Sequence, residues 1–355
     1  MKEIILNDFK KRQSTLDSFR ERLVNLIDIL IKQNNLKVHQ IVGRTKEIES
    51  LSKKIDRKQD KYSSLDEITD IVGLRIITYL ESDVNTLYDL ITKEFTVDPN
   101  NSIDKRNLAE NQFGYRSLHL VVSFNPSRSN LTEYKKFDNL KCEVQIRSIL
   151  QHAWAEIEHD LGYKSKSSIP HQYKRNFNRL AALLETADIE FDRLKKELNH
   201  YEEEVIELIK TEPQNVAIDQ ASITSFNMEN EILIEARNML TKTKKCTYSS
   251  TPTMFAGMIE RFPMFGIYTI KDLEDSLKEN KAQFFEFIKE FTKNHTYNNY
   301  INSIILFYYQ HFLAAKTEDR QNVEEYFNFE GFKINNDGDA PGHFIKTYQV
   351  IKNRI

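Results

Sequence analysis

The chain has 355 residues, of which 29% are charged and 40% hydrophobic, and its formal net charge is −3. This length suggests about two domains, and the apolar content is sufficient for packed cores. The slightly negative balance excludes the class of strongly basic nucleic-acid binders, although a local basic patch remains compatible with it.

Cysteine use and hydropathy favour the cytoplasm. The two cysteines, Cys142 and Cys246, lie far apart and not at metal-binding spacing, which argues against a disulfide framework or a zinc site. The N-terminal segment lacks the apolar core of a signal peptide. The most apolar late stretch, residues 300–315, is too short and too interrupted to span a bilayer and is better interpreted as a buried helix. We expect a cytoplasmic protein without a membrane partner.

The first half of the chain alternates helical and strand patterns. Apolar spacings of three, four and seven predict a helix over 8–33, within an N-terminal segment of residues 1–34. Runs rich in β-branched and apolar residues predict strands at 38–42, 71–80, 113–124 and 140–147. Further helices are predicted at 47–58, at 82–95 and from 148 onward, with a loop at 96–112 and a turn at 125–130. Ser64 and Glu67 have the spacing of a capping box.

Beyond residue 168 the pattern becomes almost entirely helical. Residues 169–211 read as one long charged helix, residues 211–215 as a break, and 216–355 as mostly helical without a defensible strand. The apolar face expected on the long helix consists of Leu180, Leu183, Leu184, Ala187, Ile189, Phe191, Leu194 and Leu198. We therefore predict an α/β (α+β) domain over 35–211, with a mixed sheet flanked by helices, and an all-helical domain over 216–355.

Three predicted strands carry polar clusters that could form a site. The clusters are Asp70 to Arg75, Gly114 to His119 and Glu143 to Arg147. In the third, the period of two places Glu143, Gln145 and Arg147 on one face of the sheet. A solvated sheet face gives the same pattern, but three such clusters together indicate a site for a highly charged ligand.

The residue types in these clusters suit phosphoryl transfer. Asp70 and Glu143 offer the oxygen ligands that Mg²⁺ prefers, commonly one or two carboxylates plus substrate phosphates. Basic side chains that could neutralise phosphates are Arg44, Lys46, Arg75, Arg116 and Arg147. Neither a G-x-x-x-x-G-K-[ST] loop nor a kinase-type glycine loop is present, so phosphates would not be held in a glycine-rich loop.

The motifs together resemble the synthetase domain of the RelA/SpoT family of alarmone synthetases. The resemblance covers about residues 35–200 and rests on R-x-K (44–46), D-I-V-G-L-R (70–75), G-Y-R-S-L-H (114–119), E-V-Q-I-R (143–147) and W-A-E-I-E-H-D-L-x-Y-K (154–164). It implies a nucleotidyltransferase-like fold. It also implies transfer of the β,γ-pyrophosphate of ATP to the 3′-hydroxyl of GDP or GTP, which gives ppGpp or pppGpp.

The resemblance also assigns roles to the donor side of the site. Asp70 and Glu143 would hold Mg²⁺, and Glu143 would accept the proton of the 3′-hydroxyl. Arg44 and Arg75 would sandwich the adenine, a role that suits the planar guanidinium group. Lys46 would contact the ATP phosphates.

On the acceptor side, the resemblance implies that Tyr115 stacks on the base and that His152 lies near it. His119, Gln145 and Arg147 would line the site between the two nucleotides. The loop before Tyr115 departs from the family pattern, because Phe113 replaces an asparagine and the lysine moves upstream. The resulting pair, Lys105 and Arg106, could bind the acceptor phosphates.

Several interpretations stay open at this point. Because of the altered loop, the acceptor could be GDP or GTP, or it could be the 3′ end of tRNA, as in toxin-like relatives. A third hypothesis is an inactive module that binds nucleotides or RNA. The basic residues Lys53, Lys54, Arg57, Lys58 and Lys61 are interpreted as solvated, or else as a flank that serves RNA. Glu156, Glu158, His159 and Lys164 are interpreted as the wet face of a helix. The helices of 216–355 could form a homo-oligomer or bind a protein partner.

Overall fold

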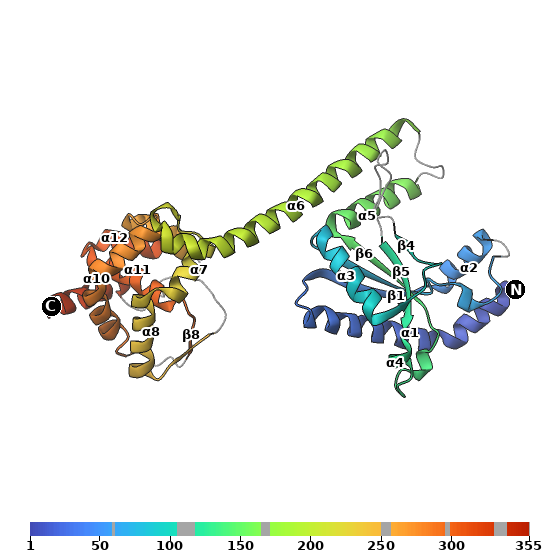
Figure 1. The fold of residues 1–355 in the computed structure, drawn as a ribbon, viewed down its shortest axis with the longest axis horizontal. Coiled ribbons are helices and arrows are strands. Elements are labelled where there is room, and N and C mark those ends of the chain that lie inside the picture. Colours follow the sequence, from blue (N-terminus) through green and yellow to red (C-terminus); the bar gives the residue numbers. More distant parts are fainter. Residues whose placement is uncertain are drawn as a thin grey trace. The chain divides into compact units, whose positions relative to one another are not determined.

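The structure, a computed structural model, divides the chain into two compact units, Met1–Lys195 and Lys196–Ile355 (Figure 1). It describes residues 1–58, 61–104, 118–164, 171–249, 257–294, 299–329 and 339–354. The predicted domain boundaries at 34, 211 and 216 stay a prediction. None of the described helices is long and apolar enough to cross a membrane.

The first unit is built on a mixed sheet, as predicted. Its strands are β1 (Val38–Thr45), β2 (Val72–Thr78), β3 (Phe95–Val97), β4 (Ile103–Asp104), β5 (Leu118–Phe124) and β6 (Cys142–Ser148). They follow the order β1-β2-β6-β5-β3, and β4 also pairs with β5. Among the described strands of this sheet, β2 and β6 are parallel neighbours, and the other neighbouring pairs are antiparallel.

Helices pack on the apolar face of this sheet. They include α1 (Lys2–Gln33) and α3 (Glu81–Glu94), whose buried side chains share one core with the sheet. The described part of this unit also contains the α-helices α2 (Ile48–Arg57), the one-turn α4 (Pro126–Ser129), α5 (Ile149–Lys164) and the first part of α6 (His171–Thr211). In β2, Val72, Leu74 and Ile76 are buried while Gly73 and Arg75 are partly exposed, so the opposite face is left for polar side chains.

Local details of the first unit correct three predictions. The predicted loop at 96–112 contains the end of β3 and the two residues of β4, and the predicted turn at 125–130 contains α4. The capping box is wrong, because the Ser64 side chain makes no cap bond, whereas the backbone N–H of Ser63 donates to Glu67 Oε2 at 2.8 Å. The one-turn 3₁₀ helix at Leu65–Glu67 is too short for the N-cap geometry that the spacing suggested.

The second unit is largely helical, as predicted. Its helices are the end of α6, α7 (Gln220–Glu229), α8 (Glu231–Lys244), α9 (Met258–Arg261), α10 (Ile270–Phe291), α11 (Ile304–Lys316), α12 (Arg320–Asn328) and α13 (Ala340–Lys352). The strands β7 (Thr247–Tyr248) and β8 (Asn299–Tyr300) form one parallel pair that the sequence did not indicate.

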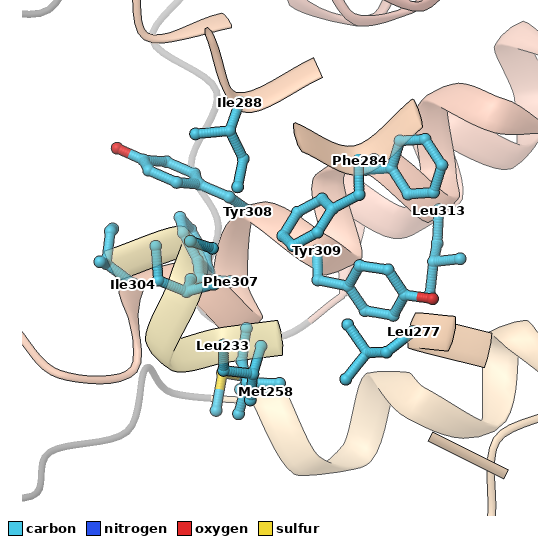
Figure 2. Close-up of a cluster of buried hydrophobic side chains, with 14 of the residues drawn as sticks. Leu233, Met258, Leu277, Phe284, Ile288, Ile304, Phe307, Tyr308, Tyr309 and Leu313 are labelled. Atoms are coloured by element: carbon cyan, nitrogen blue, oxygen red, sulfur yellow. The ribbon is translucent and has the colours of Figure 1, made fainter. Parts of the chain in front are cut away.

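Helix α11 forms the centre of the second unit. Every residue from Ile304 to Ala315 is buried, which confirms the interpretation of the apolar stretch 300–315 as a buried helix. Aromatic and aliphatic side chains of α10 and α11 pack together there, including Phe284 and Tyr309 (Figure 2). A helix that is apolar on all sides is stable only when other helices cover it. Each covering helix turns an apolar face toward α11 and a polar face toward the solvent.

Candidate active site

The polar face of the sheet gathers the predicted residues because of the strand register. Val42, Arg75, Gln145 and His119 are opposite one another across β1, β2, β6 and β5. The next row along the strands contains Arg44, Gly73, Glu143 and Val121. Residues in adjacent rows two positions apart point to the same face, so side chains from four sequence segments meet above the sheet.

A cavity lies on this face. The residues that line it are Gln40, Val42, Arg44, Asp70, Gly73, Leu74, Arg75, Ile77, Glu143, Gln145 and His152. Six of the predicted site residues are therefore brought together, namely Arg44, Asp70, Arg75, Glu143, Gln145 and His152. Gly73 lies next to the side chain of Arg44. A Cβ atom added to Gly73 would be 3.7 Å from Arg44 Nε.

Asp70 lies at the edge of the cavity, two residues before β2, and is held by two lysines. Lys46 Nζ is 3.1 Å from Asp70 Oδ2, and Lys54 Nζ is 2.7 Å from Asp70 Oδ1. Burial alone would raise the pKa of Asp70, but Lys54 and Lys46 together lower that pKa below its usual value. The carboxylate is therefore ionised at neutral pH.

Glu143 lies on β6 and contacts two of its predicted neighbours. His119 Nδ1 is 2.9 Å from Glu143 Oε1, and Gln145 Nε2 donates to Glu143 Oε2 at 3.3 Å. Burial and the nearby charge of Asp70 raise the pKa of Glu143, but the contacts with His119 and Gln145 together lower it further, so the net pKa is lowered. Two ionised carboxylates thus line one cavity.

The donor set fits a divalent cation in part. Hard carboxylate oxygens from Asp70 and Glu143 are the ligand type that Mg²⁺ takes, and one or two of them commonly act together with substrate phosphates and water. Within the ranges that the structure describes, no cluster of three or more His, Cys, Asp or Glu side chains is arranged to hold a metal ion by itself.

Arg75 of β2 and His152 of α5 both line the cavity, and both lie close to Glu156 of α5. Glu156 Oε1 accepts a hydrogen bond from Arg75 Nη1 at 2.8 Å and is 3.7 Å from His152 Nδ1. Burial and the positive charge of Arg75 lower the pKa of His152, so the imidazole is neutral at neutral pH.

Arg147 also lies on β6 but at the buried end of the strand. It is 7% exposed, and its positive charge contributes to the lowered pKa of His152. The predicted acceptor residues Tyr115, Lys105 and Arg106 lie outside the described residues, as does Arg116.

Two residues of this site were missed by the sequence interpretation. Lys54 was assigned to a solvated basic run, yet its side chain is 19% exposed and pairs with Asp70. Its position three residues after the buried Leu51 is a signal that could have placed it on the inward face of α2. Glu156 was assigned to a solvated helix face, and its side chain is indeed 56% exposed, but its hydrogen bond with Arg75 was not predicted, because local spacing does not reveal a contact between distant segments.

Comparison with known proteins assigns a family to this arrangement. Residues 43–168 match the family model described as a region found in RelA / SpoT proteins. The GTP pyrophosphokinase YjbM of Bacillus subtilis (strain 168) is 32% identical over 162 residues, which cover 44% of this chain and 72% of that protein. The GTP pyrophosphokinase YwaC of the same organism is 26% identical over 213 residues, covering 55% of this chain and 94% of the relative.

Among solved structures, small alarmone synthetase 1 from Bacillus subtilis aligns with a TM-score of 0.46 and 25% sequence identity. That alignment covers 55% of this chain and 99% of the other. The matched family region contains β2, β5 and β6 and every predicted site residue. From the extent and identity of the match to YjbM, we conclude that the chain belongs to the RelA/SpoT family.

Proposed function

We propose that this protein is a GTP pyrophosphokinase that transfers the β,γ-pyrophosphate of ATP to the 3′-hydroxyl of GDP or GTP, giving ppGpp or pppGpp and AMP. The observation that carries the proposal is the meeting of Asp70 and Glu143 in one cavity with Arg44 and Arg75 on its wall. Two named GTP pyrophosphokinases among the relatives support the same reaction class.

The two arginines support adenine binding through their place in the sheet. Val42 pairs with Arg75 and Arg44 pairs with Gly73, so Arg44 and Arg75 are diagonal neighbours on adjacent strands. Diagonal neighbours lie about 7–8 Å apart, which leaves room for one planar ring between two guanidinium groups. Arginine stacks well on such rings and brings positive charge near the phosphates.

Phosphate binding falls to the residues around Asp70. Lys46 and Lys54 neutralise that carboxylate in the free protein, and both ammonium groups would be within reach of the ATP phosphates. Mg²⁺ held by Asp70 and Glu143 would supply positive charge to offset the charge of the pyrophosphoryl group. Phosphoryl transfer depends mainly on such positioning and electrostatic stabilisation.

Glu143 is the group we assign as general base. Its lowered pKa keeps it ionised, so that one carboxylate oxygen can accept the proton of the 3′-hydroxyl. The contacts with His119 and Gln145 fix the orientation of the carboxylate. Arg147, which follows Gln145 by two residues on β6 and is buried, would support the negative charge that develops between the nucleotides.

The acceptor side is proposed from the family pattern alone. Tyr115 would stack on the acceptor base, Lys105 and Arg106 would bind its phosphates, and neutral His152 would contact the base. His152 lines the same cavity as Arg75, which supports an acceptor base bound beside the donor site.

Label transfer tests the proposal. The purified protein is incubated with Mg²⁺ and γ-labelled ATP, and GDP, GTP or deacylated tRNA is offered as acceptor. We expect label on GDP or GTP and release of AMP. Label on tRNA alone would replace the nucleotide acceptor with a tRNA acceptor, and label on none of the three would identify a binding module instead of an enzyme.

A further inference from the structure

Glu156 of α5 lies between two residues of the candidate site that have different proposed roles. Its Oε1 atom accepts a hydrogen bond from Arg75 Nη1 at 2.8 Å, and the same oxygen is 3.7 Å from His152 Nδ1. Arg75 is proposed above to stack on the adenine of ATP, and His152 to contact the acceptor base. One carboxylate oxygen therefore faces a residue from each side of the reaction.

The fold brings these three side chains together from two elements. His152 and Glu156 are four residues apart on α5, a spacing that places two side chains on the same face of a helix. Arg75 comes from β2, 81 residues away from Glu156 along the chain. Arg75 and His152 line the cavity, and Glu156 is not one of the described residues that line it. Glu156 would therefore act on a bound nucleotide through its two neighbours.

The first of these neighbours, Arg75, is restricted by its hydrogen bond to Glu156. The Arg75 side chain is 31% exposed, so without a partner its guanidinium group could adopt several rotamers. A ligand that binds a mobile side chain must also immobilise it, which weakens binding. Because Glu156 orders the guanidinium group before ATP arrives, we expect it to improve the binding of ATP.

The second neighbour, His152, has a ring nitrogen that faces the same carboxylate. His152 Nδ1 is buried and makes no hydrogen bond to any residue that the structure describes. Burial and Arg75 lower the pKa of His152, which keeps the ring neutral, whereas Glu156 acts in the opposite sense. In a neutral ring the surroundings decide which nitrogen carries the single proton. The nearby negative charge of Glu156 favours the form with the proton on Nδ1.

This form of His152 has a consequence for the acceptor base. A proton on Nδ1 leaves the lone pair on Nε2, at the tip of the side chain. Because His152 lines the cavity, Nε2 can accept a hydrogen bond from a bound base but cannot give one. Guanine carries N–H groups at N1 and N2, whereas N1 of adenine carries a lone pair. Polar groups that are buried without a partner weaken binding, so this form of His152 favours guanine.

We propose that Glu156 is a positioning residue that orders Arg75 for ATP and keeps the proton of His152 on Nδ1, so that His152 selects an acceptor base with an N–H group, as guanine has. The inference rests on the proposed function, because it requires that His152 contacts the acceptor base. The two effects of Glu156 can be measured separately, since the first concerns the binding of ATP and the second concerns the choice of acceptor.

Nitrogen-15 NMR measures the position of the proton without any catalytic activity. The full chain is labelled at its nine histidines, and the signals that disappear in His152→Gln belong to His152. The spectrum distinguishes a protonated ring nitrogen from an unprotonated one. At neutral pH we expect the proton on Nδ1 in the wild type and on Nε2 in Glu156→Ala. A wild-type proton on Nε2 would refute the proposal whatever the activity of the protein.

Label transfer from γ-labelled ATP measures the choice of acceptor. The acceptors are GDP and the 5′-diphosphate of purine riboside, whose base has no N–H group at N1 or C2. We expect the wild type to prefer GDP on the order of 100-fold in kcat/KM, the effect of one unpaired polar group, and Glu156→Ala to reduce this preference about tenfold. In the same variant the KM for ATP should rise about threefold, as for the loss of an exposed ion pair. Glu156→Gln keeps an oxygen beside Arg75 and His152 and should retain most of the preference.

Glu21→Ala is the matched control. Glu21 is also an exposed glutamate (67%, against 56% for Glu156) and accepts a hydrogen bond from an arginine, Arg20 Nη2, at 3.1 Å, but it does not line the cavity. This variant should keep the wild-type preference, the wild-type KM for ATP and the wild-type NMR signals of His152. An unchanged preference for GDP in an active Glu156→Ala variant would overturn the selection by His152. If the wild type transferred label to neither acceptor, the proposed function would fail, and the NMR spectrum would still decide the position of the proton.

Discussion

Replacing Glu143 by glutamine is expected to lower pyrophosphate transfer by about three orders of magnitude, within the range that a positioned general base contributes. The amide keeps the size of the side chain and one of the two oxygens that contact His119 and Gln145, but it cannot accept the proton of the 3′-hydroxyl. Because Lys46, Lys54 and the two cavity arginines are untouched, ATP affinity should change little. Transfer of label from ATP and binding of a non-hydrolysable ATP analogue measure the two effects separately.

Glu94→Gln provides the control for this variant. The Glu94 side chain is 26% exposed, close to the 21% of Glu143, and it is also ion-paired, with Arg128 Nη2 at 2.9 Å, but it does not line the cavity. Its activity should stay near that of the wild type. Full activity of Glu143→Gln would remove Glu143 from the mechanism, whereas loss of ATP binding together with transfer would reassign it to substrate binding.

Truncation of Phe284 to alanine is expected to destabilise the second unit by about 3–5 kcal/mol, the usual cost of removing a buried phenylalanine. Phe284 is fully buried and lies next to Tyr309 (Figure 2). The centroid of its ring is 4.8 Å from that of Tyr309 and 5.8 Å from that of Phe312. The cavity left behind would be lined by rings that are held by several neighbours and cannot collapse onto it.

Urea unfolding followed by two probes measures this effect. Trp154 is the only tryptophan of the chain and is buried in the first unit, where it contacts Phe177, so its fluorescence reports on that unit. We expect the circular dichroism transition to shift to lower urea in Phe284→Ala while the fluorescence transition stays in place. Phe285 is the next residue and is only half-buried, so Phe285→Ala should shift the circular dichroism transition less than Phe284→Ala does. Equal shifts of both transitions in Phe284→Ala would mean that the two cores unfold as one.

The sheet and most of its site could be predicted because strands have a simple period. Alternation in 143–147 placed Glu143 and Gln145 on one face, and the structure confirms that face. Which strands are neighbours does not follow from any single strand, and the row that joins Arg75 to Gln145 and His119 depends on that order. The family motifs indicated that residues from these strands form one site, which the period of a single strand could not show.

Contacts made by long flexible side chains were the least predictable part. The pairing of Lys54 with Asp70 spans a helix, a turn and a loop, and the pairing of Glu156 with Arg75 joins segments 81 residues apart. Neither has a local signature, because lysine and glutamate on a helix surface are common everywhere. In the second unit the helical period was clear, but the packing of helices around α11 depends on side-chain shapes that a sequence pattern does not encode.

The central claim is that Asp70 and Glu143 share one divalent cation beside a nucleotide held by Arg44 and Arg75. Crystals grown with Mn²⁺ and a non-hydrolysable ATP analogue test it through the anomalous signal of the metal. A single peak about 2.0–2.3 Å from carboxylate oxygens of both residues is expected, since Mn²⁺ takes the place of Mg²⁺ with only slightly longer bonds. An anomalous peak that contacts neither carboxylate, with the nucleotide bound away from the two arginines, would contradict the account.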